Sequence, residues 1–176
     1  MALVVLLRGV NVGGHRTFRP TALAERLKHL GAVNIGTAGT FVIRRPIARA
    51  QLRAALARRL PFDTEIVICH GREIAGMMSH DRFADQPVQS DIVRFVSVLS
   101  NRPRSAPSIP MRLPSSGPWV LKIVARDDRF VFGVYRRHMK AISCLGTFDR
   151  LFGVPVTTRN WNTITAIARV LAHRGA

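Results

Sequence analysis

The chain has 176 residues, of which 47% are hydrophobic and 21% are charged, a composition that excludes a disordered chain, a collagen and a coiled coil. Its 27 Lys and Arg against 10 Asp and Glu give a net charge of +17, which attracts phosphates, nucleic acids and acidic surfaces. Only three of the cations are lysine. Arginine suits bidentate phosphate contacts, although a genome rich in G and C would produce the same ratio.

The first half of the chain predicts elements in the order β-α-β-β-α-β. Residues 2–7 form a continuous apolar run that is typical of a buried strand. A glycine loop follows, and then Leu23, Leu27 and Leu30 predict a helix that opens at Pro20 and ends at Gly31. The remaining predicted elements are strands at 33–36 and 40–44, a helix that opens at Pro46 and ends at Pro61, and a strand at 64–69. This order is the split β-α-β arrangement of ferredoxin-like folds.

The second half predicts another α+β unit. We expect a short helix at 72–79, a strand at 92–99, a loop rich in Pro and Ser at 101–117, a hairpin of strands 119–125 and 130–135, a short helix at 145–152 and a last helix at 159–173. The predicted fold is therefore α+β, with two ferredoxin-like lobes at residues 1–85 and 86–176. Each lobe is expected to have a mixed or antiparallel sheet with helices on one face.

Cysteine usage and hydropathy indicate the cellular compartment in which the protein is expected. Cys69 and Cys144 lie in apolar stretches and form neither a C-x-x-C pair nor a zinc spacing. Buried, reduced thiols fit a cytoplasmic protein. No stretch approaches 18 consecutive apolar residues, so the sequence predicts no membrane span.

The first candidate for a binding site is the loop at residues 6–16, which reads LLRGVNVGGHR. Glycines let backbone N–H groups converge on an anion, and Arg8 and Arg16 add charged donors. The spacing matches neither the dinucleotide-binding fingerprint nor the P-loop, so no nucleotide motif is identified. Two interpretations stay open, an anion site and a plain turn with surface arginines.

The second candidate is residues 157–163, which read TTRNWNT before the last predicted helix. The Ser/Thr/Asn character is typical of an N-cap, whose free N–H groups attract anions. Arg159 would be unfavourable at a helix N-terminus unless an anion were bound there. The alternative is a simple cap with Trp161 in the core.

These two segments carry a resemblance to a known family. The chain resembles the bacterial family known as domain of unknown function 1697, whose members open with a strand running into L-L-R-G-I-N-V-G-G and end with a helix preceded by T-x-R-N-W-N-T. The matching residues here are 6–14 and 158–163. In a third segment, where members carry Y-I-Q-S-G-N-V, residues 35–42 retain Gly39 but replace the Gln-Ser and the Asn. The resemblance spans nearly the whole chain and implies paired ferredoxin-like lobes, with no established activity.

Together the two motifs suggest one function. We expect them to meet in a basic pocket between the lobes that binds a small molecule carrying a phosphate or carboxylate. Replacing Arg8 and Arg159 with alanine should then abolish binding and leave the melting temperature nearly unchanged. If the motifs only lock the lobes together, the same changes should lower stability. The predicted binding residues are Arg8, Asn11, Gly13, Gly14, Arg159, Asn160 and Asn162.

No catalytic constellation is visible: the six histidines and the scattered acids show no ligand or acid–base spacing, and we predict neither a metal nor a cofactor. The alternative function is an RNA- or DNA-binding module that uses the basic surface. Phe130, Phe132 and Tyr135 faintly resemble an aromatic strand that stacks bases. Core packing is the competing interpretation of these three side chains.

Overall fold

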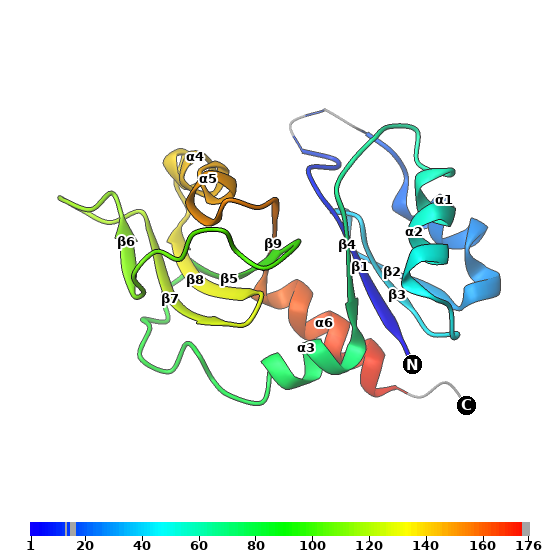
Figure 1. The fold of residues 1–176 in the computed structure, drawn as a ribbon. Helices are drawn as coiled ribbons and strands as arrows, with labels where there is room; N and C mark the ends of the chain where they lie inside the picture. Colours follow the sequence, from blue (N-terminus) through cyan, green and yellow to red (C-terminus); the bar gives the residue numbers. More distant parts are fainter. Residues whose placement is uncertain (13, 15–16, 174–176) are drawn as a thin grey trace. The chain divides into compact units, whose positions relative to one another are not determined.

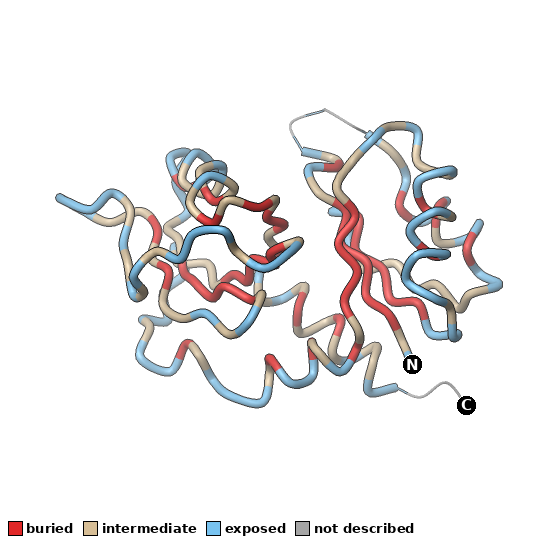
Figure 2. Tube along the Cα trace, in the orientation of Figure 1, coloured by how far each residue is buried: buried red, intermediate tan, exposed pale blue. Residues whose placement is uncertain are grey.

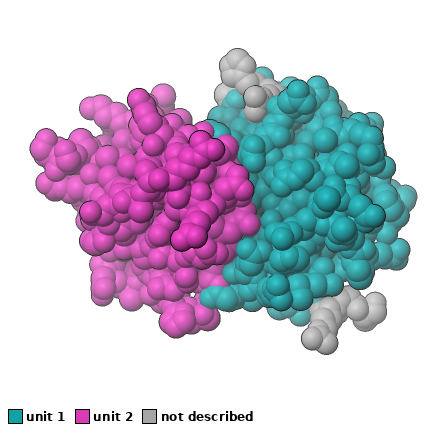
Figure 3. All heavy atoms as spheres, in the orientation of Figure 1, with its two compact units in different colours: residues 1–76, 162–176 teal, residues 77–161 magenta. Residues whose placement is uncertain are grey.

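The structure, a computed structural model, describes residues 1–12, 14 and 17–173. The chain divides into two compact units (Figure 3). Unit 1 comprises Met1–Gly76 and Asn162–Ala176, and unit 2 comprises Met77–Trp161. The last helix is thus grouped with unit 1, whereas the sequence analysis placed it in a lobe of residues 86–176.

Unit 1 contains a four-stranded antiparallel sheet with the order β2-β3-β1-β4 (Figure 1). Leu3 on the central strand pairs with Ile43 on one side and with His70 on the other. All four strands were predicted from their apolar runs, and all four are confirmed. Their bounds are β1 Leu3–Leu7, β2 Ala32–Ile35, β3 Thr40–Ile43 and β4 Ile66–His70.

Helices cover the sheet of unit 1 because their leucines point at it. Leu23, Leu27, Leu52 and Leu56 are buried in one core cluster with the odd-numbered residues of β1. Gly31, with a φ of 64°, ends the first helical segment as predicted. The helical segments of this unit are α1 Pro20–Arg26, η1 Lys28–Leu30, α2 Arg49–Ala57, all but the last residue of α3 Gly71–Met77 and all but the first residue of α6 Trp161–Ala172.

Two details differ from the expected unit 1. Helix α2 begins at Arg49 and not at Pro46, because Ala48 is still extended, with a ψ of 140°. The opposite face of the sheet is also buried: Val4, Leu6 and Cys69 have no measurable exposure (Figure 2). At the edge of this sheet, a Cβ at Gly71 would lie 2.9 Å from a methyl of Leu171, so the end of α6 packs on the β4–α3 junction.

Unit 2 contains a five-stranded antiparallel sheet with the order β6-β7-β8-β5-β9. When the short edge strand β6 is left out, four strands remain in unit 2. Counted in chain order, they have the same spatial order as the four strands of unit 1, which is second, third, first, fourth. Both sheets are therefore compatible with the split β-α-β arrangement, with a loop in unit 2 where unit 1 has α1. The strands are β5 Ile92–Leu99, β6 Met111–Leu113, β7 Leu121–Asp127, β8 Phe130–Arg136 and β9 Val156–Asn160.

Three predictions for unit 2 are wrong. Strand β6 lies inside the predicted loop 101–117, because an edge strand tolerates the flanking Pro110 and Pro114. Residues 156–160 form β9 and not a helix start, because pairing with β5 overrides the N-cap pattern. The single helix expected at 145–152 is two helices, α4 Met139–Gly146 and α5 Phe148–Phe152.

The core of unit 2 is built from aromatic rings beneath α5. The ring centroids of Phe95 and Phe148 are 6.0 Å apart, and those of Phe148 and Phe152 are 5.9 Å apart. Tyr135 packs at the margin of this cluster, with its ring centroid 5.8 Å from that of Phe95. This core fixes the strands that carry the candidate sites below.

Tyr135 makes the stability of unit 2 sensitive to alkaline pH. Burial raises the pKa of its phenol above 10, and the nearby charge of Arg137 acts in the opposite direction. The neutral phenol is therefore favoured in the folded state, and this stability is present below pH 10 and lost as the pH rises through the raised pKa. We expect Tyr135→Phe to lose less stability than the wild type between about pH 9 and about pH 11, measured by urea unfolding. Parallel losses in both proteins would contradict this assignment.

Candidate functional site

The first predicted motif is a loop closed by its own asparagine. Asn11 has a φ of 54°, in the left-handed region. Its Nδ2 donates to the carbonyl of Thr37 at 2.8 Å, and its Oδ1 accepts from the backbone N–H of Phe18 at 2.9 Å. Both ends of the amide are thus engaged in holding the loop against the β2–β3 turn. Gly13 lies outside the described residues, and Gly14 has a φ of 76°.

Arg8 lines a pocket of about 460 Å³ beside two carboxylates. Its backbone is held by Thr64, whose hydroxyl donates to the Arg8 carbonyl at 2.5 Å, and by the Glu65 carbonyl, which accepts from the Arg8 N–H at 3.1 Å. Asp63 and Glu65 line the same pocket. One guanidinium beside two acids does not make this pocket attractive to an anion.

Arg159, the cation of the second motif, is a buried strand residue. It is opposite Val96 in the β5–β9 ladder and is only 7% exposed. Its Nη1 donates to the carbonyl of Thr158 at 2.9 Å, and burial lowers its pKa from the usual value of an arginine to about 10. The expected placement at a helix N-terminus is wrong, because the strand continues to Asn160.

The other members of the second motif are more exposed. Asn160 ends β9 and Asn162 lies in the first turn of α6, both on the surface. Trp161 packs against Phe83, with ring centroids 5.1 Å apart and planes at 70°. This contact agrees with the alternative interpretation that placed Trp161 in a core.

The two motifs belong largely to different units. Arg8, Asn11, Gly14 and Asn162 are in unit 1, whereas Arg159 and Asn160 are in unit 2. A single pocket formed by both motifs therefore stays a prediction.

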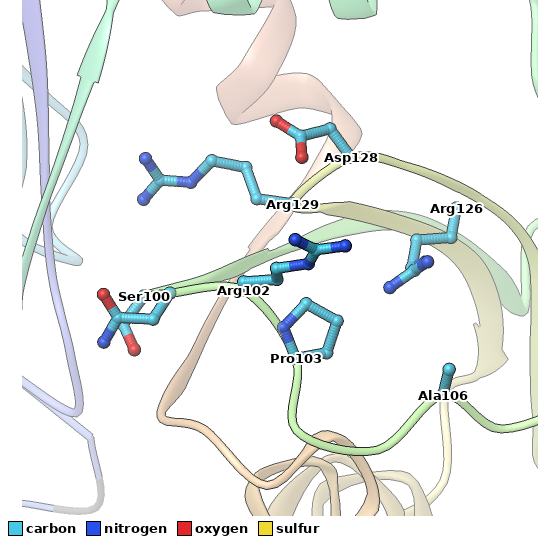
Figure 4. A pocket seen from close by; sticks show the side chains of 8 residues that line it. Ser100, Arg102, Pro103, Ala106, Arg126, Asp128 and Arg129 are labelled. Carbon is cyan, nitrogen blue, oxygen red and sulfur yellow. The ribbon is translucent and has the colours of Figure 1, made fainter.

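Unit 2 contains a basic pocket that the sequence analysis missed. It has a volume of about 570 Å³ and lies between the loop that follows β5 and the tip of the β7–β8 hairpin (Figure 4). We call it the arginine pocket. Its lining residues are Ser100, Asn101, Arg102, Pro103, Ala106, Arg126, Asp128 and Arg129.

Hydrogen bonds to the backbone fix both walls of the arginine pocket. Leu99 at the end of β5 donates its N–H to the Arg129 carbonyl at 2.9 Å, and Arg129 returns a bond from Nε to the Leu99 carbonyl at 3.1 Å. The loop wall is tied to α5, because the N–H of Arg104 donates to the Phe152 carbonyl at 2.9 Å. One wall of the pocket is therefore held by the sheet, and the other is held by α5.

The charge of the arginine pocket is positive and incompletely paired. Three guanidinium groups line it against the single carboxylate of Asp128. Among the described residues, neither Arg102 nor Arg126 has an ion-pair or hydrogen-bond partner, and the buried Oγ of Ser100 has none either. In Figure 4 the side chain of Arg102 extends between those of Arg129 and Arg126. A hydroxyl donor and unpaired guanidinium groups are what an anionic group needs.

The sequence contained a partial signal for this pocket. The Arg126–Arg129 stretch was identified as a hairpin turn, and the loop from Asn101 as a connection. Only the pairing of β5 with β8 brings the two segments together, since they are more than 20 residues apart in the chain.

The aromatic strand proposed for base stacking is part of the core. Phe130 and Phe132 are buried, and Tyr135 packs beside Phe95. The Phe132 ring centroid lies 6.0 Å from that of Phe83. Core packing of these rings is confirmed, so they offer no stacking platform.

Two further features of the described residues concern the cysteines and the helices. Neither Cys69 nor Cys144 is in a disulfide, and Cys69 is buried. No helix in the described part of the chain has the length and apolarity that a membrane crossing requires.

The fold and site define an α+β protein with two antiparallel sheets and an arginine-lined pocket. The chain belongs to the family described as protein of unknown function DUF1697, whose model matches residues 1–118. It is also similar in structure to the conserved bacterial protein SP0830 from Streptococcus pneumoniae, with a TM-score of 0.59 and 16% sequence identity, over 97% of this chain and 98% of that one. At this identity the likeness concerns the fold alone. No curated protein matches the sequence significantly.

Proposed function

We propose that this protein binds a small molecule carrying a phosphate or carboxylate group, and that the anionic group occupies the arginine pocket of unit 2. The observation that carries the proposal is the pair of guanidinium groups, on Arg102 and Arg126, that line one pocket without a carboxylate partner among the described residues. Like charges held together repel, and a bound anion removes that repulsion.

The neighbouring groups support the same ligand. The buried Ser100 Oγ can donate to an anionic oxygen, as can the side-chain amide of Asn101. Asp128 is the one acid of the lining, and the net charge of the pocket stays at about +2 with it included. The contrast with the Arg8 pocket, where acids outnumber the cation, favours unit 2 as the binding site.

The test is a calorimetric titration with inorganic pyrophosphate, and in a second arm with citrate, to separate phosphate from carboxylate ligands. Each charge-assisted hydrogen bond is worth about 1.5–3 kcal/mol. We therefore expect Arg102→Ser with Arg126→Ser to weaken binding of the preferred probe by at least about a hundredfold. The double variant should keep the wild-type melting temperature, because neither side chain makes a hydrogen bond or ion pair within the described residues.

The matched control is Lys140→Ser with Arg150→Ser. It removes the same charge from the same unit at two exposed positions outside the pocket. Equal affinities in the control and the pocket variant would show a general charge effect and would rule the pocket out. Absence of binding of both probes to the wild type would also refute the proposal.

A further inference from the structure

A second basic feature of unit 2 combines cations with a tryptophan. The Nζ of Lys122 and the guanidinium carbon of Arg136 each lie 4.3 Å from the centroid of the Trp119 ring. Arg136 also donates from Nε to the Trp119 carbonyl at 3.2 Å. The indole is half-buried and is held by cations at the margin of the sheet.

The strand register places further cations on the same face. Arg112 on β6 is opposite Lys122 on β7, Lys122 is opposite Val134 on β8, and Val134 is opposite Arg94 on β5. Residues directly opposite in a sheet share a face, and so do residues two apart on one strand. Arg136 therefore joins the row. We call the set Arg94, Arg112, Lys122, Arg136 and Trp119 the basic face.

The charge of the basic face is poorly balanced. Arg112 and Lys122 are like charges at directly opposed positions, an arrangement that destabilises a strand pair. Arg136 forms an ion pair with one carboxylate, since Asp91 Oδ2 lies 3.1 Å from its Nη1. The guanidinium of Arg94 lies over the Phe83 ring at 5.4 Å. A polyanion beside Arg112 and Lys122 would offset the repulsion between them.

We propose that the basic face binds single-stranded nucleic acid, with phosphates on its cations and one base on Trp119. Proteins that bind single strands combine a cationic track with an aromatic ring on which a base stacks. The tryptophan favours this partner over an acidic protein surface, which has no planar base to stack. The basic face is also separate from the arginine pocket, because none of its residues lines that pocket.

The fluorescence of Trp119 reports binding without any change at the site. The chain has two tryptophans, so a Trp161→Phe background leaves Trp119 as the single indole. We expect an oligothymidylate of about 15 nucleotides, and an oligouridylate of the same length, to quench this emission on binding. If the oligonucleotide bound saturably without quenching the emission, it would bind elsewhere on the protein, and the proposal would be overturned.

Two variants in the native background separate stacking from charge. Trp119→Leu should weaken oligonucleotide binding by about tenfold, and Arg112→Ser should reduce the slope of log K against log salt by about 0.7. Lys140 is an exposed lysine outside the sheet, and Lys140→Ser should leave both the affinity for the oligonucleotide and the quenching unchanged. Because Arg112→Ser alters only an exposed side chain, it remains informative even if Trp119→Leu folds poorly.

Further outcomes decide between partners. Equal quenching by polyglutamate would assign the face to an acidic protein and refute nucleic-acid stacking. A duplex of the same length that binds as tightly as the single strand would also refute it. The double variant at Arg102 and Arg126 should bind the oligonucleotide as the wild type does, so failure of the proposed small-molecule function and failure of this inference are distinguishable.

Discussion

Gly133→Ala is expected to lower the free energy of unfolding by about 3 kcal/mol. Gly133 lies in the middle of β8, opposite Ile123 and Phe95. A Cβ there would collide with the Phe95 ring and would lie 2.5 Å from the backbone carbonyl oxygen of Lys122. Neither neighbour can yield, because one is backbone and the other is packed against Phe148.

Urea unfolding at neutral pH measures this effect. The matched control is Gly146→Ala at the end of α4, where an added Cβ has no neighbour within 4 Å. Alanine exceeds glycine in helix propensity, so the control should gain up to about 0.5 kcal/mol. A Gly133→Ala protein as stable as the wild type would mean that the β7–β8–β5 contact is looser than described.

Arg159→Met is expected to be at least as stable as the wild type, and Arg159→Ala to be less stable than Arg159→Met by about 3 kcal/mol. Burial lowers the pKa of Arg159 to about 10, and a fall of this size corresponds to about 3 kcal/mol against the charged form in the folded state. Methionine removes that charge and retains most of the volume, whereas alanine leaves a cavity.

The pH dependence provides an independent check of Arg159. In the unfolded chain Arg159 keeps its proton to a higher pH than in the folded protein, where burial lowers its pKa to about 10. Between the two pKa values the unfolded state binds more protons, so the wild type gains stability relative to Arg159→Met as the pH rises. Urea unfolding of both proteins at about pH 8 and about pH 11 measures the difference. A methionine variant clearly less stable than the wild type at neutral pH would show that the contacts of the guanidinium outweigh its desolvation.

The burial of Arg159 in β9 also changes how the second motif is tested. From the sequence alone, replacing Arg8 and Arg159 with alanine is expected to abolish ligand binding and to leave the melting temperature nearly unchanged. With the side chain buried in β9, we now expect the melting temperature to fall regardless of any ligand. Binding measurements at Arg8 and Arg159 therefore need the methionine variant, which separates the charge from the packing.

Local patterns were sufficient wherever one segment determined its own structure. The apolar run at residues 2–7 is strand β1, the leucine spacing after Pro20 is α1, and Gly31 ends that segment in a left-handed conformation. The family resemblance rested on the same kind of information, because its motifs are contiguous stretches of chain.

Long-range pairing decided the rest. Residues 157–163 were predicted to cap the last helix, yet residues 156–160 pair with β5 about 60 residues earlier, and the ladder hydrogen bonds outweigh the local preference. Asn11 was predicted as a binding residue, and only the tertiary structure shows that its amide bonds to Thr37 and Phe18 close the loop.

The α+β class, most strands, the family and the positive charge that favours an anionic partner could all be predicted from the sequence. The places where that charge is concentrated depend on the tertiary fold. The arginine pocket joins residues of the β7–β8 turn to the loop after β5, and the basic face joins β5, β6, β7 and β8. Both depend on strand register, which places side chains from distant segments next to one another and which no local pattern encodes.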